Sequence, residues 1–556
     1  MVILRHIVAV LVVTLAMAGG ARAQSSAAEP APKDGEAGTP QEPDLSFKLN
    51  GYYRVRGVTM GNVPVLNGMG QADAKGATFF FQRLRLEPSL TYGFGGKDYE
   101  AKLTAQIDAL DNVVWGDNAR LAGVPIFAGS PSNTNVLGAD VASIELKRIW
   151  LELMTPVGLL GVGRMPLAFG LKILNHDGNG LSDWGDPIYT DSADWVFFAT
   201  EPLTIANAIA TGDTRSTPLY FLIGYAQLAE DTLVDPKADV GSDAIDPTTR
   251  DDVPFRFLAD GGDDVSSVVV AVGWTDKKIN PRKPADMLDI GMYGSHRWQS
   301  STESYVYVAE LAGKLRHTPW AGLPAIYAEG DIYTIQGESR GVPFAGGCNT
   351  ERCDNMDANI WGGAFRLGAI EGNLEWTKWM SYLELGFSSG DGKLLSDPHL
   401  TARPNHPDYR VGLLMYQVAV NAASAQLGTD LRGLWSLGGV YNSRYIYPQV
   451  RYSLWRGFEL HLAWLAAWAD ELNPSIYINE RGNRNNTSCG IAEGDCFLGW
   501  EVDGAVRVKW GKDDLFRWDT EVGLMRAGSA LYTQGVAFGL GKPWLWTLQT
   551  RLAMIW

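Results

Sequence analysis

Charged residues recur at every second position in several segments of the 556-residue chain. In residues 497–510, Glu501, Asp503, Arg507 and Lys509 alternate with apolar or small residues. A period of two places charged and apolar side chains on opposite faces of a β-strand. Such a charged face could guide ions, or its charges could neutralise one another as ion pairs. The candidate basic residues are Lys48, Arg54, Arg56, Arg83, Arg85, Arg507, Lys509 and Arg551, and the candidate acidic residues are Glu87, Glu501, Asp503, Asp519 and Glu521.

Catalytic chemistry is not indicated. No nucleophile elbow with the partners of a catalytic triad stands out, and the sequence has no HExxH zinc motif. His461 stands near Glu459, a pair whose ordinary role is structural. We therefore expect a protein that is not an enzyme.

Two oxygen-rich segments could bind cations. Residues 176–186 contain Asp177, Asn179, Asp183 and Asp186, which could ligate calcium, although their spacing differs from that of a calcium-binding helix–loop–helix. A turn rich in Asp and Asn is the alternative. Residues 230–264 carry eleven acids and three bases, a net −8. This segment could bridge through divalent cations to lipopolysaccharide, or it could be a solvated acidic loop. No other cofactor is expected.

The four cysteines form two close pairs in polar, Gly-rich contexts. An exported protein meets an oxidising compartment, which favours local disulfides over zinc ligation at these spacings. The predicted disulfides are Cys348–Cys353 and Cys489–Cys496.

The N-terminus predicts export. Residues 1–23 have a weakly basic start, a short apolar core and an Ala-Arg-Ala cleavage site, which together predict a signal peptide. Residues 24–44 are rich in Pro, Ala, Gly and acid, and predict a disordered periplasmic linker. Removing Arg5 and Arg22 with the signal peptide changes the formal charge from −16 to −18.

Residues 45–556 predict an all-β fold, a transmembrane antiparallel β-barrel of about 18 strands. Residues 543–556 place Trp544, Trp546, Leu548, Leu552 and Trp556 on one face, and the chain ends on an aromatic residue. Trp500 and Trp510 lie about 33 Å apart along a strand, a spacing that fits two aromatic girdles once the strand tilts by about 45°. The expected strands are 45–58, 78–92, one around 102–108, 141–154, 159–171, 194–205, 217–228, 265–275, 287–298, 304–315, 323–336, 358–369, 374–387, 444–454, 458–469, 497–510, 514–527 and 543–556.

Loop lengths give an independent check on the strand count. Short turns at 93–98, 155–158, 371–373, 455–457 and 511–513 fit the periplasmic side, and the long segments between them fit the extracellular side. Sixteen strands is the alternative, because 194–217 and 410–443 are ambiguous. A barrel this wide leaves an aqueous channel unless loops fill it. The long segment 388–443 is a candidate constriction, with Arg403 and Arg410 as residues that could line it; a membrane-surface excursion or a further hairpin is the alternative.

Three stretches resemble the alginate-export and porin-like group of outer-membrane channels: QRLRLEP at 82–88, VGRMPLAFG at 162–170 and ELGFSSGDG at 384–392. The resemblance implies an 18-stranded barrel with loops that fold inward, and it does not transfer alginate as a substrate.

Composition excludes two other classes. Beyond the N-terminus no run of 18 apolar residues occurs, which excludes a polytopic helical membrane protein. An acidic balance of 63 acids against 47 bases excludes a general nucleic-acid binder.

We expect a channel in the outer membrane of a Gram-negative-type bacterium that passes small polar or anionic solutes passively. Its expected partners are outer-membrane lipid, lipopolysaccharide and those solutes, and the sequence predicts no oligomeric state. An export channel for an anionic exopolysaccharide is the first alternative. A surface adhesin or receptor barrel, whose loops would do the binding, is the second.

Overall fold

The computed structural model describes most of the chain after residue 44. The signal peptide and linker predicted for residues 1–44 lie outside the described residues, and these predictions stay untested. The described ranges are 45–66, 72–93, 99–115, 144–229, 264–277, 279–280, 283–300, 303–320, 322–339, 356–373, 376–392, 399–422, 436–472, 496–533, 536–537 and 543–556.

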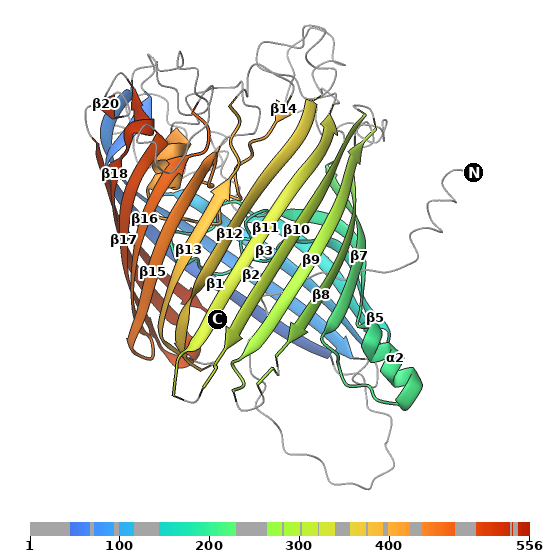
Figure 1. The fold of residues 1–556 in the computed structure, drawn as a ribbon. Helices are drawn as coiled ribbons and strands as arrows, with labels where there is room; N and C mark the ends of the chain where they lie inside the picture. The colour runs from blue at the N-terminus through green and yellow to red at the C-terminus, as the bar shows by residue number, and fades with distance from the viewer. Residues whose placement is uncertain are drawn as a thin grey trace, which may run out of the picture.

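Eighteen antiparallel strands form a closed barrel (Figure 1). Closure is direct, because β1 pairs with β2 on one side and with the last strand, β21, on the other. The barrel strands are β1 (Leu45–Leu66), β2 (Ala72–Gly93), β3 (Glu100–Val114), β4 (Ile144–Thr155), β5 (Gly158–Pro166), β6 (Ser192–Thr200), β7 (Leu219–Ala229), β8 (Val265–Asp276), β9 (Met287–Gln299), β10 (Ser304–His317), β11 (Ala325–Ser339), β12 (Met356–Gly372), β13 (Thr377–Ser388), β15 (Ser443–Trp455), β16 (Phe458–Ala469), β17 (Phe497–Trp510), β18 (Phe516–Ala527) and β21 (Trp544–Ile555).

Shorter elements lie in the connections, among them two 3₁₀ turns at Lys512–Asp514 and Ser529–Leu531. The two-residue strand β14 (His399–Leu400) pairs in parallel with β12, and β19 (Tyr532–Thr533) pairs with β20 (Val536–Ala537). Helix α2 (Pro202–Thr211) connects β6 to β7 and has no buried residue. No helix in the described part of the chain has the length and hydropathy needed to span a membrane.

Alternation of burial along each strand explains the barrel. In β21, Leu552 is 54% exposed and the neighbouring Arg551 is fully buried. Outward side chains are therefore mostly apolar and inward ones mostly polar, the reverse of a soluble protein. Some inward residues, such as Leu498 and Leu545, are apolar and pack in the buried cluster inside the barrel. Backbone groups are satisfied by the neighbouring strand all round, as a lipid environment requires. The structure is an outer-membrane barrel.

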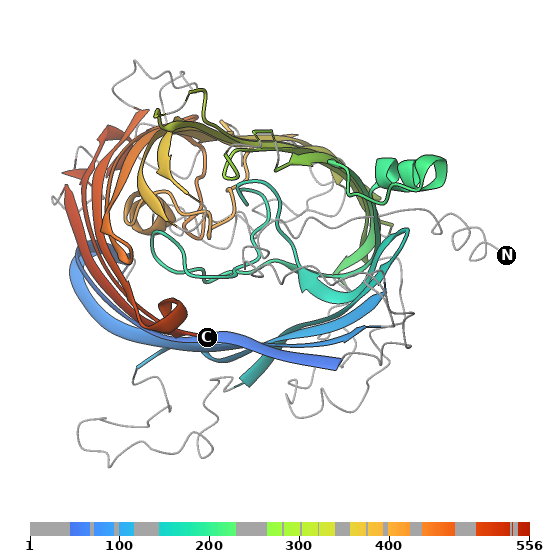
Figure 2. The same ribbon diagram turned by 90° about the horizontal axis from the view of Figure 1, so that it is seen from below.

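Connections differ between the two ends. Short turns join β4 to β5 and β15 to β16 at the end that also holds the start of β1 and the end of β21, and this is the periplasmic end. The long connections lie at the extracellular end. Two of them turn into the barrel: segment I, residues 167–191 between β5 and β6, and segment II, residues 401–442 between β13 and β15, of which 423–435 lie outside the described residues. Seen along the barrel, both occupy the lumen inside the ring of strands (Figure 2).

The expected number of 18 strands is confirmed, and the sixteen-strand alternative is wrong. Several strand boundaries differ from the prediction. β1 runs on to Leu66 and β2 begins at Ala72, beyond the expected 58 and 78. The strand expected at 194–205 ends at Thr200, because Pro202 starts α2. The strand expected at 159–171 ends at Pro166, where segment I leaves the wall. In the described part of 410–443, a short π-helix, η4 (Met415–Val420), takes the place of a strand.

Candidate functional site

Arginines on the lumen face are the most deeply buried large side chains in the barrel wall. Each is at most 1% exposed, although each points into a lumen that is wide enough for water. Segment I covers them. They are Arg54 and Arg56 on β1, Arg83 and Arg85 on β2, Arg148 on β4 and Arg551 on β21.

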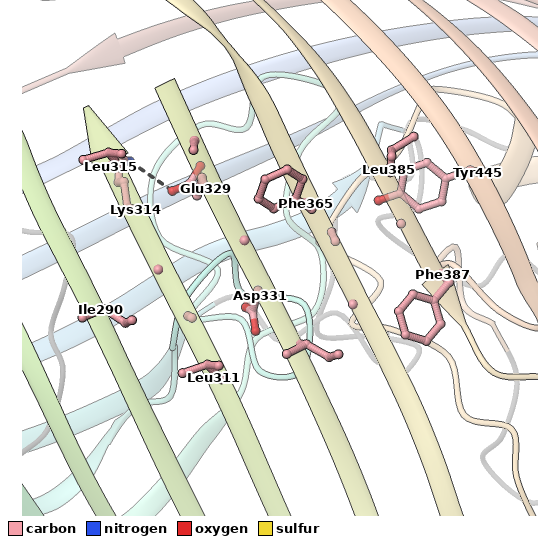
Figure 3. A pocket seen from close by; sticks show the side chains of 18 of the residues that line it. Ile290, Leu311, Lys314, Leu315, Glu329, Asp331, Phe365, Leu385, Phe387 and Tyr445 are labelled. Atoms are coloured by element: carbon pink, nitrogen blue, oxygen red, sulfur yellow. Dashed lines mark ion pairs between the residues drawn. The ribbon is translucent and has the colours of Figure 1, made fainter. Parts of the chain in front are cut away.

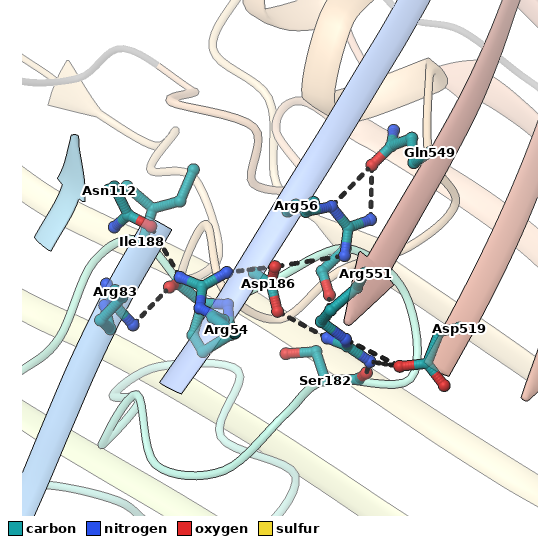
Figure 4. A network of polar contacts seen from close by, with 12 residues as sticks. Arg54, Arg56, Arg83, Asn112, Ser182, Asp186, Ile188, Asp519, Gln549 and Arg551 are labelled. Carbon is teal, nitrogen blue, oxygen red and sulfur yellow. Dashed lines mark hydrogen bonds and ion pairs between the residues drawn. The ribbon is translucent and has the colours of Figure 1, made fainter. Parts of the chain in front are cut away.

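Asp186 of segment I lies at the centre of this arginine cluster (Figure 4). Its carboxylate forms ion pairs with Arg54, with Arg56 at 3.2 Å and with Arg551 at 2.5 Å. Burial alone would raise the pKa of Asp186, but the three guanidinium groups outweigh it and hold the pKa well below its usual range. Asp186 is therefore ionised and pins segment I to β1 and β21.

Two acids of β18 complete the network. Glu521 accepts a hydrogen bond from Arg56 at 2.5 Å, and Asp519 accepts one from Arg551 Nε at 2.7 Å. Glu521 also accepts the backbone N–H of Gly185 at 3.2 Å. The cluster thus contains three cations, Arg54, Arg56 and Arg551, and three anions, Asp186, Asp519 and Glu521. Arg517 also donates a hydrogen bond to Asp519 at 2.9 Å, and it lines the cavity described below. Counted without Arg517, the network is neutral, and losing one member leaves an unpaired charge.

Other wall residues hold the backbone of segment I. Arg85 donates to the carbonyl of Gly178 at 2.7 Å, and Arg148 donates to the carbonyl of Asp177 at 2.7 Å. On the opposite wall, Asp331 of β11 accepts the backbone N–H of Leu171 at 2.9 Å. Because these contacts come from opposite sides of the barrel, segment I crosses the lumen.

Segment II is held by a carboxylate of β17. Glu501 accepts three backbone N–H groups, from Leu413 and Leu414 at 2.7 Å and from Met415 at 2.6 Å. These are the unpaired donors at the start of η4, which a carboxylate satisfies well. Gly412 precedes them with φ of 75°, and an added Cβ there would lie 2.8 Å from Glu501 Oε2. Glycine at this position lets the carboxylate approach the backbone.

The two segments meet at a histidine junction. The rings of His176 and His406 stack with centroids 5.4 Å apart, and His406 Nε2 lies 3.2 Å from the Asp191 carboxylate. Asp408 accepts the backbone N–H of Ile188 at 2.7 Å. Burial, together with the nearby charge of Lys172, lowers the pKa of His176 to about 3, so its ring is neutral at pH 7.

This junction also contains a cluster of potential metal ligands. His176, His406 and Asp408 offer three ligand atoms within 4.8 Å of one another. Both histidine Nδ1 atoms, however, accept backbone N–H groups, from Gly178 and from Asp408. These contacts leave the proton on each Nε2, a tautomer suited to hydrogen bonding between the segments.

A polar cavity of about 290 Å³ lies at the periplasmic end, between segment I and β15–β18. Arg451, Arg507 and Arg517 line it together with Arg456 and Lys509. Three acids, Asp183, Glu459 and Asp514, also line it, so five cations against three anions give a formal charge of +2. The cavity adjoins the cluster around Asp186, because Arg517 also bonds Asp519 at 2.9 Å.

Comparisons with known proteins give structural neighbours only. No protein-family model matches the chain, and no curated protein matches its sequence. Among solved structures it is similar to Pseudomonas aeruginosa OccK5, with 9% identity and a TM-score of 0.44 over 91% of this chain and 97% of that chain. It is also similar to OccK11 of the same species, with 11% identity and a TM-score of 0.43 over 91% and 95%.

A third similar structure is the P. aeruginosa outer membrane protein OpdK, with 10% identity and a TM-score of 0.43 over 92% of this chain and 99% of that chain. At this level of similarity, the fold and function of the chain rest on its own geometry. The resemblance to the alginate-export group finds no support in these comparisons.

Most of the predicted charged residues lie on the lumen face, but they form separate groups. Arg54, Arg56, Arg551, Asp519 and Glu521 share the Asp186 network. Arg83 pairs with Asp111 and Arg85 with Asp108. Arg507 bonds Glu459 at 2.8 Å and contacts His461 at 3.0 Å, and Glu87 accepts a hydrogen bond from Gln106 at 2.5 Å. Asp503 is fully buried beside Glu501. Lys48 and Lys509 are exposed near the periplasmic end.

The constriction candidates lie on segment II. Arg410 sits beside segment I, where an added Cβ on Gly185 would lie 2.5 Å from its Nη1. The backbone carbonyl of Arg403 accepts the Ser388 hydroxyl at 2.7 Å, which ties segment II to β13. The set of charged residues at the constriction is therefore larger than these two, because segment I contributes as well.

The calcium candidates in segment I bond to different partners. Asp177 pairs with Lys172 at 2.7 Å, Asn179 accepts from Gln106 at 2.8 Å, and Asp183 pairs with Arg451. With Asp186 in the arginine cluster, the four side chains do not converge on one point, and calcium stays a prediction. Cys496 is buried and disulfide-bonded. Cys348, Cys353 and Cys489 lie outside the described residues, as does most of the acidic segment 230–264, so the pairing also stays a prediction.

Sequence reasoning missed the acids that neutralise the wall. Asp108 and Asp111 on β3 pair with arginines of β2, and Arg148 on β4 bonds segment I. Alternation places Asp108 on the polar face of its strand, but it does not show that this carboxylate pairs with Arg85. No sequence pattern around Asp186 indicates that its side chain contacts β1 and β21.

Proposed function

We propose that the protein is an outer-membrane channel for small polar solutes whose lumen is narrowed by segments I and II. An 18-stranded barrel with a polar inner wall is wide enough to hold water. Segments I and II, fixed by ion pairs and backbone hydrogen bonds, reduce that width. Their buried apolar side chains, such as Ile173 and Leu414, pack in one cluster with inward residues of the wall. The observation that carries the proposal is the crossing of segment I between Asp186 on one wall and the Leu171–Asp331 bond on the other.

We further propose a preference for anions. Support comes from the cavity at the periplasmic end, where five cations face three anions. The arginine cluster around Asp186 gives no such support, because its charges cancel. Positively charged linings set selectivity through the field that they focus in a narrow, water-filled passage.

Planar-bilayer recording tests both parts. The full-length barrel should conduct in symmetrical KCl, and under a KCl gradient its reversal potential should indicate anion preference. A barrel that never conducts would overturn the channel, and a cation-selective reversal potential would overturn the preference while leaving the channel standing.

The two alternatives predict different results. Export of an anionic polysaccharide needs a lumen that a hydrated polymer can enter. Segments I and II obstruct the lumen of this barrel. Purified anionic polysaccharide should therefore not block the current of the channel. An adhesin or receptor would not conduct at all. No catalytic step forms part of the proposal.

A further inference from the structure

A long apolar groove crosses the outer face of the barrel. It has a volume of about 1020 Å³ and runs over β9, β10, β11, β12, β13 and β15 (Figure 3). Small outward residues form its floor: Gly313, Ala328, Gly330 and Gly363. An added Cβ on Gly330 would lie 3.0 Å from Phe365 Cδ2, which shows that this glycine faces outward beneath a bulky neighbour.

Bulky side chains form the edges of the groove. Ile290, Leu311, Phe365 and Leu385 are 43–47% exposed on the lipid-facing surface. Strand register aligns Ile290 with Gly313, Gly330, Phe365, Leu385 and Ile446 in one row across six strands. At about 4.8 Å per strand the row is roughly 24 Å long. With strands tilted by about 45° it covers about 17 Å of depth, close to one leaflet of a hydrocarbon core of about 30 Å.

One end of the groove carries a positive charge. Arg444 and Trp468 line it at the extracellular end, where β15 begins and β16 finishes. Arg444 faces outward and is 51% exposed, although it belongs to a membrane strand. Its Nη2 bonds Asp470, which is held in turn by the backbone N–H of Gly390 at 2.9 Å. Within the described residues this is the one hydrogen bond of the Arg444 side chain, so its Nε and Nη1 can bind another acceptor.

We propose that this groove binds a lipid A molecule of lipopolysaccharide, with an acyl chain along the Gly313–Gly330–Gly363 floor and a phosphate on Arg444. The apolar groove fits a flexible hydrocarbon chain, and a guanidinium in an aromatic girdle fits a phosphate. Arg444 lies at the extracellular end, so the lipid belongs to the outer leaflet.

The barrel offers a matched control for Arg444. Arg164, toward the extracellular end of the short strand β5, also faces outward, is 56% exposed and pairs with an aspartate, Asp194, at 2.6 Å. It does not line the groove. A larger side chain at Gly313 tests whether filling the groove excludes the lipid. The position tolerates one, because an added Cβ makes ordinary contacts of 3.6 Å with Asp289 O and 3.8 Å with Ile290 Cγ1.

Native mass spectrometry of the full-length barrel in mild detergent, with bisphosphorylated lipid A added, measures the bound fraction. The wild type and Arg164→Gln should retain lipid A equally. Arg444→Gln should bind about tenfold more weakly, as expected for the loss of a charge-assisted hydrogen bond. Gly313→Leu combined with Ala328→Leu should also lose the lipid, because the new side chains occupy its chain position. Lipid A without phosphates should bind the wild type no better than Arg444→Gln binds bisphosphorylated lipid A.

Three results would overturn the proposal. Equal retention by all variants would show that lipid A binds elsewhere or not at all. Equal binding of lipid A with and without phosphates would remove the role of Arg444. Lipid-free wild-type dimers that become monomers in the Gly313→Leu and Ala328→Leu variant would make the groove a contact between two barrels.

Discussion

Asp186→Asn is the substitution that tests the anchoring of segment I most selectively. Asparagine keeps the size of the side chain and removes its charge. Three buried guanidinium groups, those of Arg54, Arg56 and Arg551, would then share two remaining anions, Asp519 and Glu521. The cluster changes from neutral to a net charge of +1 in a site that is almost closed to water.

The cost follows from that unpaired charge. Removing one partner of a buried ion pair typically costs about 3–5 kcal/mol. The strands keep their full hydrogen-bond ladder, so the penalty falls on the docking of segment I and not on the barrel. At about 1.4 kcal/mol per factor of ten, the detached state becomes roughly 10²- to 10³-fold more populated.

Single-channel recording in planar bilayers measures this effect. Asp186→Asn should show new current fluctuations and a higher mean conductance than the wild type, because segment I leaves the lumen more often. Asp213→Asn is the control, since it breaks an exposed ion pair with Arg215 on the β6–β7 connection and should leave the current unchanged. Identical currents for Asp186→Asn and the wild type would refute the assignment of Asp186 as the anchor.

Three further predictions concern segment II, the histidine junction and the cavity at the periplasmic end. Glu501→Gln keeps one acceptor for the N–H groups of Leu413, Leu414 and Met415 but loses the charge, so hydrogen exchange at those amides should quicken; unchanged exchange would contradict this. His176 has a lowered pKa when docked, so below about pH 6.5 the released side chain takes up a proton that the docked one does not. The free energy that docks segment I should therefore weaken by up to about 1.4 kcal/mol per pH unit between pH 6.5 and 4.5, and current noise should rise at pH 5. The variant His176→Asn should abolish this rise, and noise that persists in the variant would contradict the prediction. Lys509→Gln removes an exposed cation of that cavity and should shift the reversal potential toward lower anion preference, whereas a shift of opposite sign would refute the charge argument.

The barrel could be predicted from the sequence because each strand shows its own alternation of apolar and polar residues, whatever the rest of the chain does. Lipid outside and water inside impose alternation of apolar and polar residues on each strand, as in residues 497–510 and 543–556. Counting the segments that alternate in this way gives the number of strands. Boundaries were wrong where a proline stopped the pattern, as at Pro166 and Pro202.

The interior could be predicted only in part. Alternation places Arg54, Arg56 and Arg551 on the inner face, and the structure buries all three there. It could not show that segment I returns Asp186 to them, because the contact between residues 56 and 186 depends on the three-dimensional path of an irregular segment. Whether wall arginines face water or ion pairs depends on such contacts, so the sequence left both the anion pathway and the self-neutralising network open.

The central claim is that segment I narrows a conducting barrel, and replacing residues 172–190 by a short Gly-Ser linker tests it most directly. The measurement is single-channel conductance in symmetrical KCl for the full-length barrel and for this replacement. The wild type should conduct, and the replacement should conduct several times more strongly. A wild type that conducts as well as the replacement, or a replacement that does not conduct at all, would contradict the account.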